Sequence, residues 1–214
     1  MTLVAIHQPD LLPYSGFWFK MAVSDVFVVA RHDQFQKHGY QRRVTMRETW
    51  VSHQLVGKPS LVPITEVEVQ PGWQDRLVAA IRGRYAGARY WRERGTDLLE
   101  RIAACEGTHL DEVNLSLIEV VRDLLGIDTP LVVTEPPAGR GLDRLVEQVH
   151  AAGGDAYLSG AGGASYLGED AAERFAAAGI ELRWSDHEAP SPDSVVTLLM
   201  DLEDPRDACL RRHR

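Results

Sequence analysis

The chain has 214 residues, a hydrophobic fraction of 44%, a charged fraction of 25% and a formal net charge of −8. These values are typical of an ordinary globular protein of one domain that is long enough to bury a substantial core. The acidic balance argues against binding to a nucleic acid duplex, because that affinity comes largely from cations that neutralise phosphates. No apolar run approaches the ~20 residues of a membrane span, and the first residues lack the basic segment of a signal peptide.

The two cysteines, Cys105 and Cys209, are too few for a disulfide framework and lack the spacing of a metal site. A reduced, cytoplasmic setting is therefore expected. Cys105 falls inside a helical pattern beside two alanines, and Cys209 falls in the last residues of the chain. Neither thiol is a good candidate for a catalytic nucleophile.

The first element in chain order is a short buried strand over residues 3–6, four apolar residues that include the β-branched Val4 and Ile6. Pro9 and Pro13 cannot donate to a sheet ladder, so the strand is expected to end near Gln8. His7 and Gln8 therefore lie where a rigid strand meets a turn, which is a common position for functional residues. A helix over residues 16–22 is expected next, and Lys20 lies within it.

A second buried strand is predicted over residues 26–30, because this run is almost continuously apolar. A polar cluster follows it directly, made of Arg31, His32, Asp33, Gln34, Gln36, Lys37 and His38. Two strands that both end in ionisable residues predict a shared cleft at their carboxyl ends, provided that the strands are neighbours in the sheet.

The rest of the chain divides into three parts. Further strands are expected over residues 40–46, 50–56 and 64–69, and a helical segment over about residues 72–126. Its third helix is expected to begin at Thr108, with Asp111 in a capping box, and to end at Gly126. From residue 131 onwards strands alternate with helices. The fold class predicted is α/β, with a mixed, mainly parallel sheet, helices on its faces and a helical middle segment, as one domain over residues 1–204 and a flexible tail over residues 205–214.

A glycine-rich loop follows the strand predicted at residues 156–158. It runs from Ser159 through Gly160 and two further glycines to Ser165, and it resembles a phosphate loop only at first sight. Ser165 stands where a dinucleotide-binding fingerprint needs its third glycine, and no Gly-Lys-Ser/Thr follows. The loop can still turn backbone N–H groups toward a ligand, but no nucleotide cofactor is predicted.

General acid–base catalysis is the chemistry that explains the ionisable residues after the first two strands with the fewest assumptions. His7 would act as the general base, because an imidazole titrates near neutral pH. Asp33 and Gln8 would orient it, and Lys20 and Arg43 would contact an anion or the negative charge of a transition state. The other expected substrate contacts are Tyr14, His32, Gln34, Lys37, Ser159 and Gly160.

A metal site is the alternative use of the same residues. His7, His32, His38 and Asp33 could converge on one zinc or iron ion, although none of them has the helical i, i+4 spacing of a zinc protease. No metal and no cofactor is included in the predicted site.

Several blocks of the chain carry a resemblance to a known family. The opening run Ile6-His7-Gln8-Pro9, followed by Pro13, Gly16-Phe17 and Lys20, resembles the start of the WbqC-like protein family. Later blocks that resemble the family are Ser24-Asp25-Val26-Phe27-Val28, Asp33-Gln34-Phe35-Gln36-Lys37, Leu125-Gly126-Ile127, and Tyr157-Leu158-Ser159-Gly160 with Gly163 and Tyr166. The resemblance spans nearly the whole chain.

The resemblance implies a role in a pathway that builds surface polysaccharides or small natural products. Combined with the residues above, it predicts a biosynthetic enzyme, a transferase that moves an acyl or aminoacyl group to an amine. The first alternative is a non-catalytic protein that binds a sugar, a nucleotide or a carrier-borne intermediate, and the second is a metal-dependent hydrolase. The expected partner is a small-molecule or carrier-borne substrate, with no membrane, and a homodimer is left open.

Overall fold

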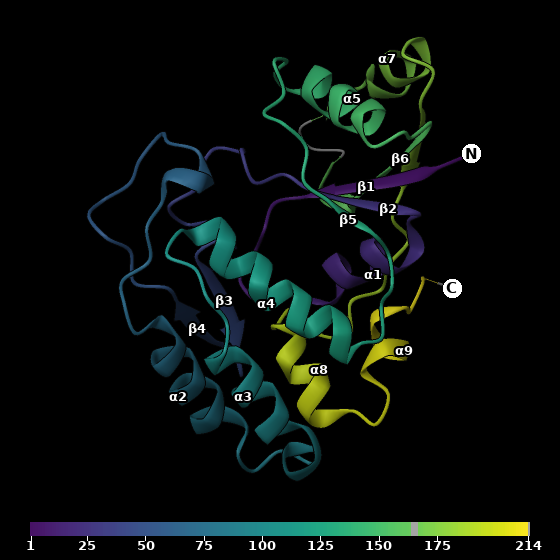
Figure 1. The fold of residues 1–214 in the computed structure, drawn as a ribbon. Helices are drawn as coiled ribbons and strands as arrows, with labels where there is room; N and C mark the ends of the chain where they lie inside the picture. Colours follow the sequence, from purple (N-terminus) through teal and green to yellow (C-terminus); the bar gives the residue numbers. More distant parts are fainter. Residues whose placement is uncertain (164–166, 214) are drawn as a thin grey trace.

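A five-stranded parallel sheet forms the centre of the protein in the computed structural model, which describes residues 1–163 and 167–213 (Figure 1). The strand order is β5-β2-β1-β6-β7, and every neighbouring pair is parallel. The strands are β1 (Leu3–His7), β2 (Val26–Val29), β5 (Leu131–Val132), β6 (Ala156–Ser159) and β7 (Glu181–Trp184). The predicted fold class, α/β with a mainly parallel sheet, is confirmed.

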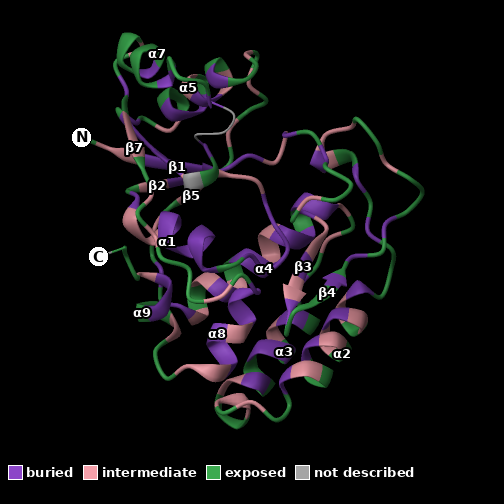
Figure 2. Ribbon diagram, turned by 180° about the vertical axis from the view of Figure 1, so that it is seen from behind, coloured by how far each residue is buried: buried purple, intermediate pink, exposed green. Residues whose placement is uncertain are grey.

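Alternating side chains of the central strands enter two separate cores, as the period of two along a strand requires. Val4 and Ile6 of β1 pack with the helices α5 (Leu142–Ala151) and α7 (Ala171–Ala177). Ala5 faces the opposite side, where α1 (Ser15–Val23) covers β1 and β2. Both views place α5 and α7 on one side of the sheet and α1 on the other (Figures 1 and 2). His7 follows this alternation and points to the α1 side, where its ring meets the edge of Phe17 at a centroid distance of 5.0 Å.

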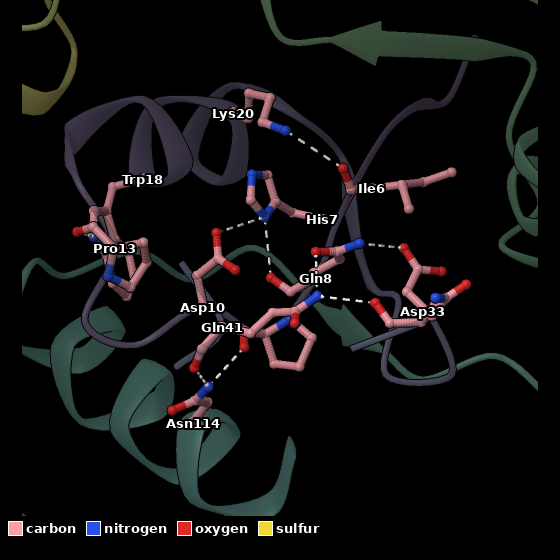
Figure 3. Close-up of polar contacts among 12 residues, drawn as sticks. Ile6, His7, Gln8, Asp10, Pro13, Trp18, Lys20, Asp33, Gln41 and Asn114 are labelled. Carbon is pink, nitrogen blue, oxygen red and sulfur yellow. Dashed lines mark hydrogen bonds and ion pairs between the residues drawn. The ribbon is translucent and has the colours of Figure 1, made fainter. Parts of the chain in front are cut away.

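The helical segment expected around residues 72–126 packs below the sheet together with a small hairpin. It contains α2 (Trp73–Tyr85), the π-helical turn η2 (Trp91–Gly95), α3 (Thr96–Ala103) and α4 (Leu110–Leu124), and the hairpin consists of β3 (Arg43–Met46) and β4 (Thr49–Ser52). One continuous apolar core joins these helices to α1 and to the lower face of the sheet. This arrangement lets α4 support the turn after β1 from below (Figure 3).

Three local predictions differ from the structure. The strand expected over residues 64–69 is wrong, because Ile64–Glu66 forms the 3₁₀ turn η1 and only single bridges follow, at residues 68 and 69. The third helix of the segment has His109 as its N-cap, one residue later than Thr108. The Glu112 carboxylate accepts the backbone N–H groups of both residues, so the acidic cap comes from Glu112 and not from Asp111.

The end of the chain is part of the fold up to residue 213. The helix α8 (Val195–Asp201) is capped by the Ser194 hydroxyl, and Pro205–Cys209 forms α9, which lies against α1. Cys209 is buried, and residue 212 forms a bridge with His187. Residues 205–213 are therefore anchored, where the sequence predicted a flexible tail.

Candidate active site

A cavity lies at the carboxyl ends of β1, β2 and β6, beside the ionisable residues that follow β1 and β2. Its volume is about 520 Å³. The connection after β1 crosses one face of the sheet through α1 to reach β2, whereas α5 crosses the opposite face to bring β6 to the other side of β1. In parallel α/β sheets such a reversal opens a crevice at the strand ends, and ligands bind there. His7 at the end of β1 and Gly160 just after β6 both line the cavity.

The imidazole of His7 is held in one tautomer by the turn that follows β1. Its Nδ1 lies 3.0 Å from the backbone oxygen of Gln8, and a carbonyl can only accept, so Nδ1 carries the proton. Nε2 is therefore the acceptor nitrogen. No described residue hydrogen-bonds to Nε2, and the side chain keeps 25% of its surface exposed. In this state His7 presents a proton acceptor to the cavity.

Asp10 and Lys20 complete a buried cluster around His7. An Asp10 carboxylate oxygen lies 3.7 Å from Nδ1 of His7, and the Lys20 ammonium donates a long hydrogen bond of 3.4 Å to the backbone oxygen of Ile6 (Figure 3). Asp10 and Lys20 are each only 7% exposed, and no described group donates a hydrogen bond to the Asp10 carboxylate. Because water solvates this cluster poorly, the protonation state of each of the three groups depends strongly on the other two.

The pKa values of this cluster follow from that burial. Burial, and then the charge of Lys20, lower the pKa of His7 from 6.5 to about 3. Burial raises the pKa of Asp10 from 3.8 to about 7, against the attraction of Lys20. Burial lowers the pKa of Lys20 from 10.5 to about 8, against the attraction of Asp10. At neutral pH His7 is neutral, Lys20 is mostly charged and Asp10 is close to its midpoint.

A chain of hydrogen bonds ties the turn after β1 to the loop after β2. The Gln8 amide donates to the Asp33 carboxylate at 2.9 Å and accepts from the Gln41 amide at 2.6 Å (Figure 3). Asp33 also forms an ion pair with Arg144 of α5. The two loops that the sequence predicted to share a cleft therefore meet directly, through Gln8 and Asp33.

The turn itself is fixed by the elements beneath it. The buried Asn114 side chain of α4 donates to the backbone oxygens of Pro9, at 2.8 Å, and Gln41, at 2.7 Å. The indole of Trp18 donates to the oxygen of Pro13 at 3.0 Å, and the Ser194 hydroxyl donates to the oxygen of Leu12 at 2.7 Å. These anchors hold a turn that contains two prolines and a left-handed residue, Leu12, with φ of 40°.

The structure brings the three residues predicted to be catalytic to one cavity, together with three of the predicted substrate contacts. His7, Gln8, Tyr14, Lys20, Asp33 and Gly160 all line the cavity. Ser159 lies beneath the wall, fully buried, with its hydroxyl hydrogen-bonded to the backbone oxygen of Gly160 at 3.3 Å. Asp33 contacts Gln8 and Arg144, whereas the carboxylate nearest to His7 is that of Asp10.

Besides Ser159, four predicted substrate contacts do not line the cavity, namely His32, Gln34, Lys37 and Arg43. Arg43 lies in the hairpin, donates to the backbone oxygen of His38 at 2.8 Å and stacks over the Trp50 ring at 4.1 Å from its centroid. Its guanidinium is thus engaged away from the site, and the arginine that reaches the cavity is Arg144.

Sequence reasoning missed Asp10, Arg144 and His187 as lining or neighbouring groups. Asp10 carried a usable signal, because it is three residues after His7 in the same proline turn. His187 lines the cavity and pairs with the Ser15 hydroxyl at 2.9 Å. Arg144 and His187 lie in segments with no motif, and only the packing of α5 and of the segment after β7 brings them to the site.

The structure also bears on the metal site and on the two thiols considered from the sequence. In the part of the chain that the structure describes, no group of three or more His, Cys, Asp or Glu side chains is arranged to hold a metal ion. Burial raises the pKa of the Cys209 thiol to about 12 and that of Cys105 by less, so both thiols stay protonated at neutral pH. Ser165 and Tyr166 lie outside the described residues.

Comparison with models of known protein families identifies the family of this chain. The model of the WbqC-like protein family matches residues 8–192 of the 214. The chain belongs to the WbqC-like protein family. Neither a curated protein nor a solved structure matches it significantly. The family match begins at Gln8 and covers Asp10, Lys20, Asp33 and Arg144, so most of the cavity of this WbqC-like protein is built from the matched region. Among its described residues no helix is long and apolar enough to cross a membrane.

Proposed function

We propose that this WbqC-like protein is a biosynthetic enzyme that transfers an acyl or aminoacyl group to an amine, with His7 as general base. One observation carries the proposal: His7 lines an open cavity with its proton fixed on Nδ1, which leaves Nε2 as an acceptor, and the Lys20 ammonium lines the same cavity. A base, a nearby cation and a cavity of about 520 Å³ are the parts that an acyl transfer without a nucleophilic cysteine needs.

The proposed step is an addition followed by an elimination. The amine nitrogen attacks the carbonyl carbon of the acyl donor, forming the new C–N bond, and gives its proton to Nε2 of His7. The carbonyl oxygen becomes negative and is stabilised by Lys20. The bond to the leaving group then breaks, and His7 returns the proton to that group. Asp10, 3.7 Å from Nδ1, stabilises the imidazolium while it exists.

The remaining groups position the reactants. Gln8 and Asp33 hold the floor of the cavity through their 2.9 Å hydrogen bond, and Arg144 neutralises Asp33. The exposed Tyr14 and Gly160 also line the walls of the cavity. A carrier-borne or small acyl donor would lie between these walls, with its carbonyl toward Lys20. The place in natural-product or surface-polysaccharide biosynthesis rests on the family resemblance.

The second candidate is a non-catalytic binding protein for a sugar, a nucleotide or a carrier-borne intermediate. The pKa of about 3 favours it, because an imidazole that is so hard to protonate is a weak proton acceptor. In that case His7 would accept a hydrogen bond from the ligand and keep it unprotonated.

Acyl thioesters of N-acetylcysteamine, with hydroxylamine as the amine, test the proposal, because release of the thiol can be followed directly. We expect amine-dependent thiol release, reduced about 10²-fold or more in His7→Ala while the affinity for the thioester is retained. His38→Ala is the matched control, because His38 is exposed and outside the cavity. Thiol release that is equal in wild type and His7→Ala contradicts a general base at this position. Thioester binding that is lost in His7→Ala, with no turnover in either protein, favours the binding protein.

A further inference from the structure

A second cavity lies between β4 and α2, and it shares no lining residue with the first. Its volume is about 220 Å³. Leu11, Leu77 and Ala80 supply its apolar surface, and no acidic residue of the described chain lines it. Two arginines, Arg76 and Arg84, do so. Ser52, His53 and Gln54 add neutral polar groups to the lining. In a protein with a net charge of −8, a small cavity whose charged lining residues are both arginines is suited to an anion with an apolar body.

Two tryptophans make the walls. Trp73 is buried, and its indole N–H donates to the backbone oxygen of Gly107 at 3.2 Å, which fixes the ring. Trp50 stands at the rim with 47% of its surface exposed, and the Arg43 guanidinium covers one ring face at 4.1 Å. Fixed aromatic walls favour a flat ring as ligand, because an aromatic pair contributes beyond the area that it buries.

His53 offers a hydrogen-bond acceptor to this cavity. The side-chain N–H2 group of Asn114 donates to two backbone oxygens, those of Pro9 and Gln41, so Oδ1 of Asn114 is the atom that contacts His53. Nε2 of His53, 3.2 Å from that oxygen, must therefore carry the ring proton. Nδ1 is left as an acceptor. No described residue donates to it, although His53 is only 4% exposed.

The two arginines differ in how many of their N–H groups are already used in hydrogen bonds to the described residues. Arg76 uses both Nη groups on the backbone oxygens of Pro71 and Gln70, at 2.9 and 2.7 Å. Arg84 uses only Nη1, on the oxygen of Ala80 at 3.0 Å, and its Nη2 and Nε have no partner among the described residues. Arg84 is thus the group that can bind a carboxylate through further N–H donors.

We propose that the cavity between β4 and α2 is a binding site for a small aromatic carboxylate that carries a hydroxyl donor on its ring. The ring lies against Trp50 and Trp73, the carboxylate pairs with Arg84, and the hydroxyl donates to Nδ1 of His53. The volume equals that of about seven liquid water molecules, which suits one substituted ring and is too small for a nucleotide.

The test is calorimetric titration of the full chain with 4-hydroxybenzoate, benzoate and 4-hydroxybenzamide. We expect saturable binding of 4-hydroxybenzoate, and binding about tenfold weaker for each of the other two, because one lacks the hydroxyl donor and the other the negative charge. Arg84→Gln should weaken binding of 4-hydroxybenzoate about tenfold. Arg82→Gln, an exposed arginine two residues away on α2 and outside this cavity, should leave it unchanged.

Three results would overturn the proposal. The first is no saturation up to concentrations on the order of 10 mM. The second is equal binding in wild type and Arg84→Gln. The third is a loss of binding in Lys20→Met that matches the loss in Arg84→Gln, since it would place the carboxylate in the first cavity. Because the comparison between the three ligands uses the wild-type protein, it remains decisive if a variant does not fold.

Discussion

Replacing Lys20 with methionine should make the protein more stable. Lys20 lies in α1 with 7% of its surface exposed, and within the described part of the chain its only hydrogen bond is the 3.4 Å contact with the oxygen of Ile6. Methionine has nearly the same length and no charge to desolvate. If Lys20 serves catalysis, the protein retains its charge although that charge lowers the stability of the folded state.

The magnitude follows from the pKa. The pKa of Lys20 is 10.5 unperturbed and about 8 in the folded protein. Below pH 8 both the folded and the unfolded chain carry the proton, so the folded state bears the full cost, which for this difference is about 3 kcal/mol. As the pH rises from 8 to 10.5 the folded state loses its proton first, so the cost is relieved and the wild type gains stability. Lys20→Met should therefore be about 2–3 kcal/mol more stable at pH 7, and the gain should shrink towards pH 10.

Denaturant unfolding of wild type and Lys20→Met at pH 7 and pH 10 measures this difference. The corresponding shift in Tm at pH 7 is about 5–10 °C for a chain of this size. Lys58→Met is the control, because Lys58 is exposed and should change the free energy of unfolding by less than about 0.5 kcal/mol. A Lys20→Met protein that is less stable than wild type at pH 7 would refute the reasoning, because the ammonium would then stabilise the fold.

Three further predictions concern the groups around the first cavity. Asn114→Ala leaves two backbone oxygens and one imidazole N–H without their buried partner, and should cost about 3–5 kcal/mol in denaturant unfolding, whereas Ser116→Ala on the same helix should cost about 0.5 kcal/mol or less. Gly163→Ala should lower the free energy of unfolding by about 1–3 kcal/mol, because the new Cβ would overlap the hydroxyl oxygen of Ser159 in β6. The control is Gly162→Ala, whose Cβ would meet no atom of the described residues within 4 Å. An equal loss of stability in the two variants would contradict this. The pH profile of kcat/KM should be bell-shaped, with limbs near the pKa values of about 7 for Asp10 and about 8 for the lysine, and Asp10→Asn should remove the acidic limb.

The strands and the first half of the site could be predicted from the sequence for a physical reason. Parallel strands are buried on both faces, so residues 26–29 form an uninterrupted apolar run, and Pro9 marks where β1 has to end. Because β1 and β2 are neighbours in register, with His7 opposite Val29, the residues that follow them meet at one edge. The contact between Gln8 and Asp33 could therefore be predicted from local sequence patterns.

The rest depends on tertiary packing that no local pattern encodes. Arg144 reaches the cavity only because α5 crosses the opposite face of the sheet from α1. The charge of Arg43 predicts an anion contact, but the hairpin directs its guanidinium to Trp50. Four of the six residues 64–69 are β-branched, which predicts a strand, yet a 3₁₀ turn forms at Ile64–Glu66, where Ile64 is fully buried in the core.

The proposed chemistry depends on His7 being a neutral imidazole that is protonated on Nδ1 and keeps Nε2 as an acceptor for a ligand in the cavity. Nitrogen-15 NMR of histidine-labelled protein, followed from pH 8 to pH 4, tests it without any substrate. The account predicts that His7 shows the Nδ1–H tautomer at pH 7 and is still neutral at pH 5, in line with its pKa of about 3. A His7 signal that titrates near 6.5, or that shows the proton on Nε2, would contradict it.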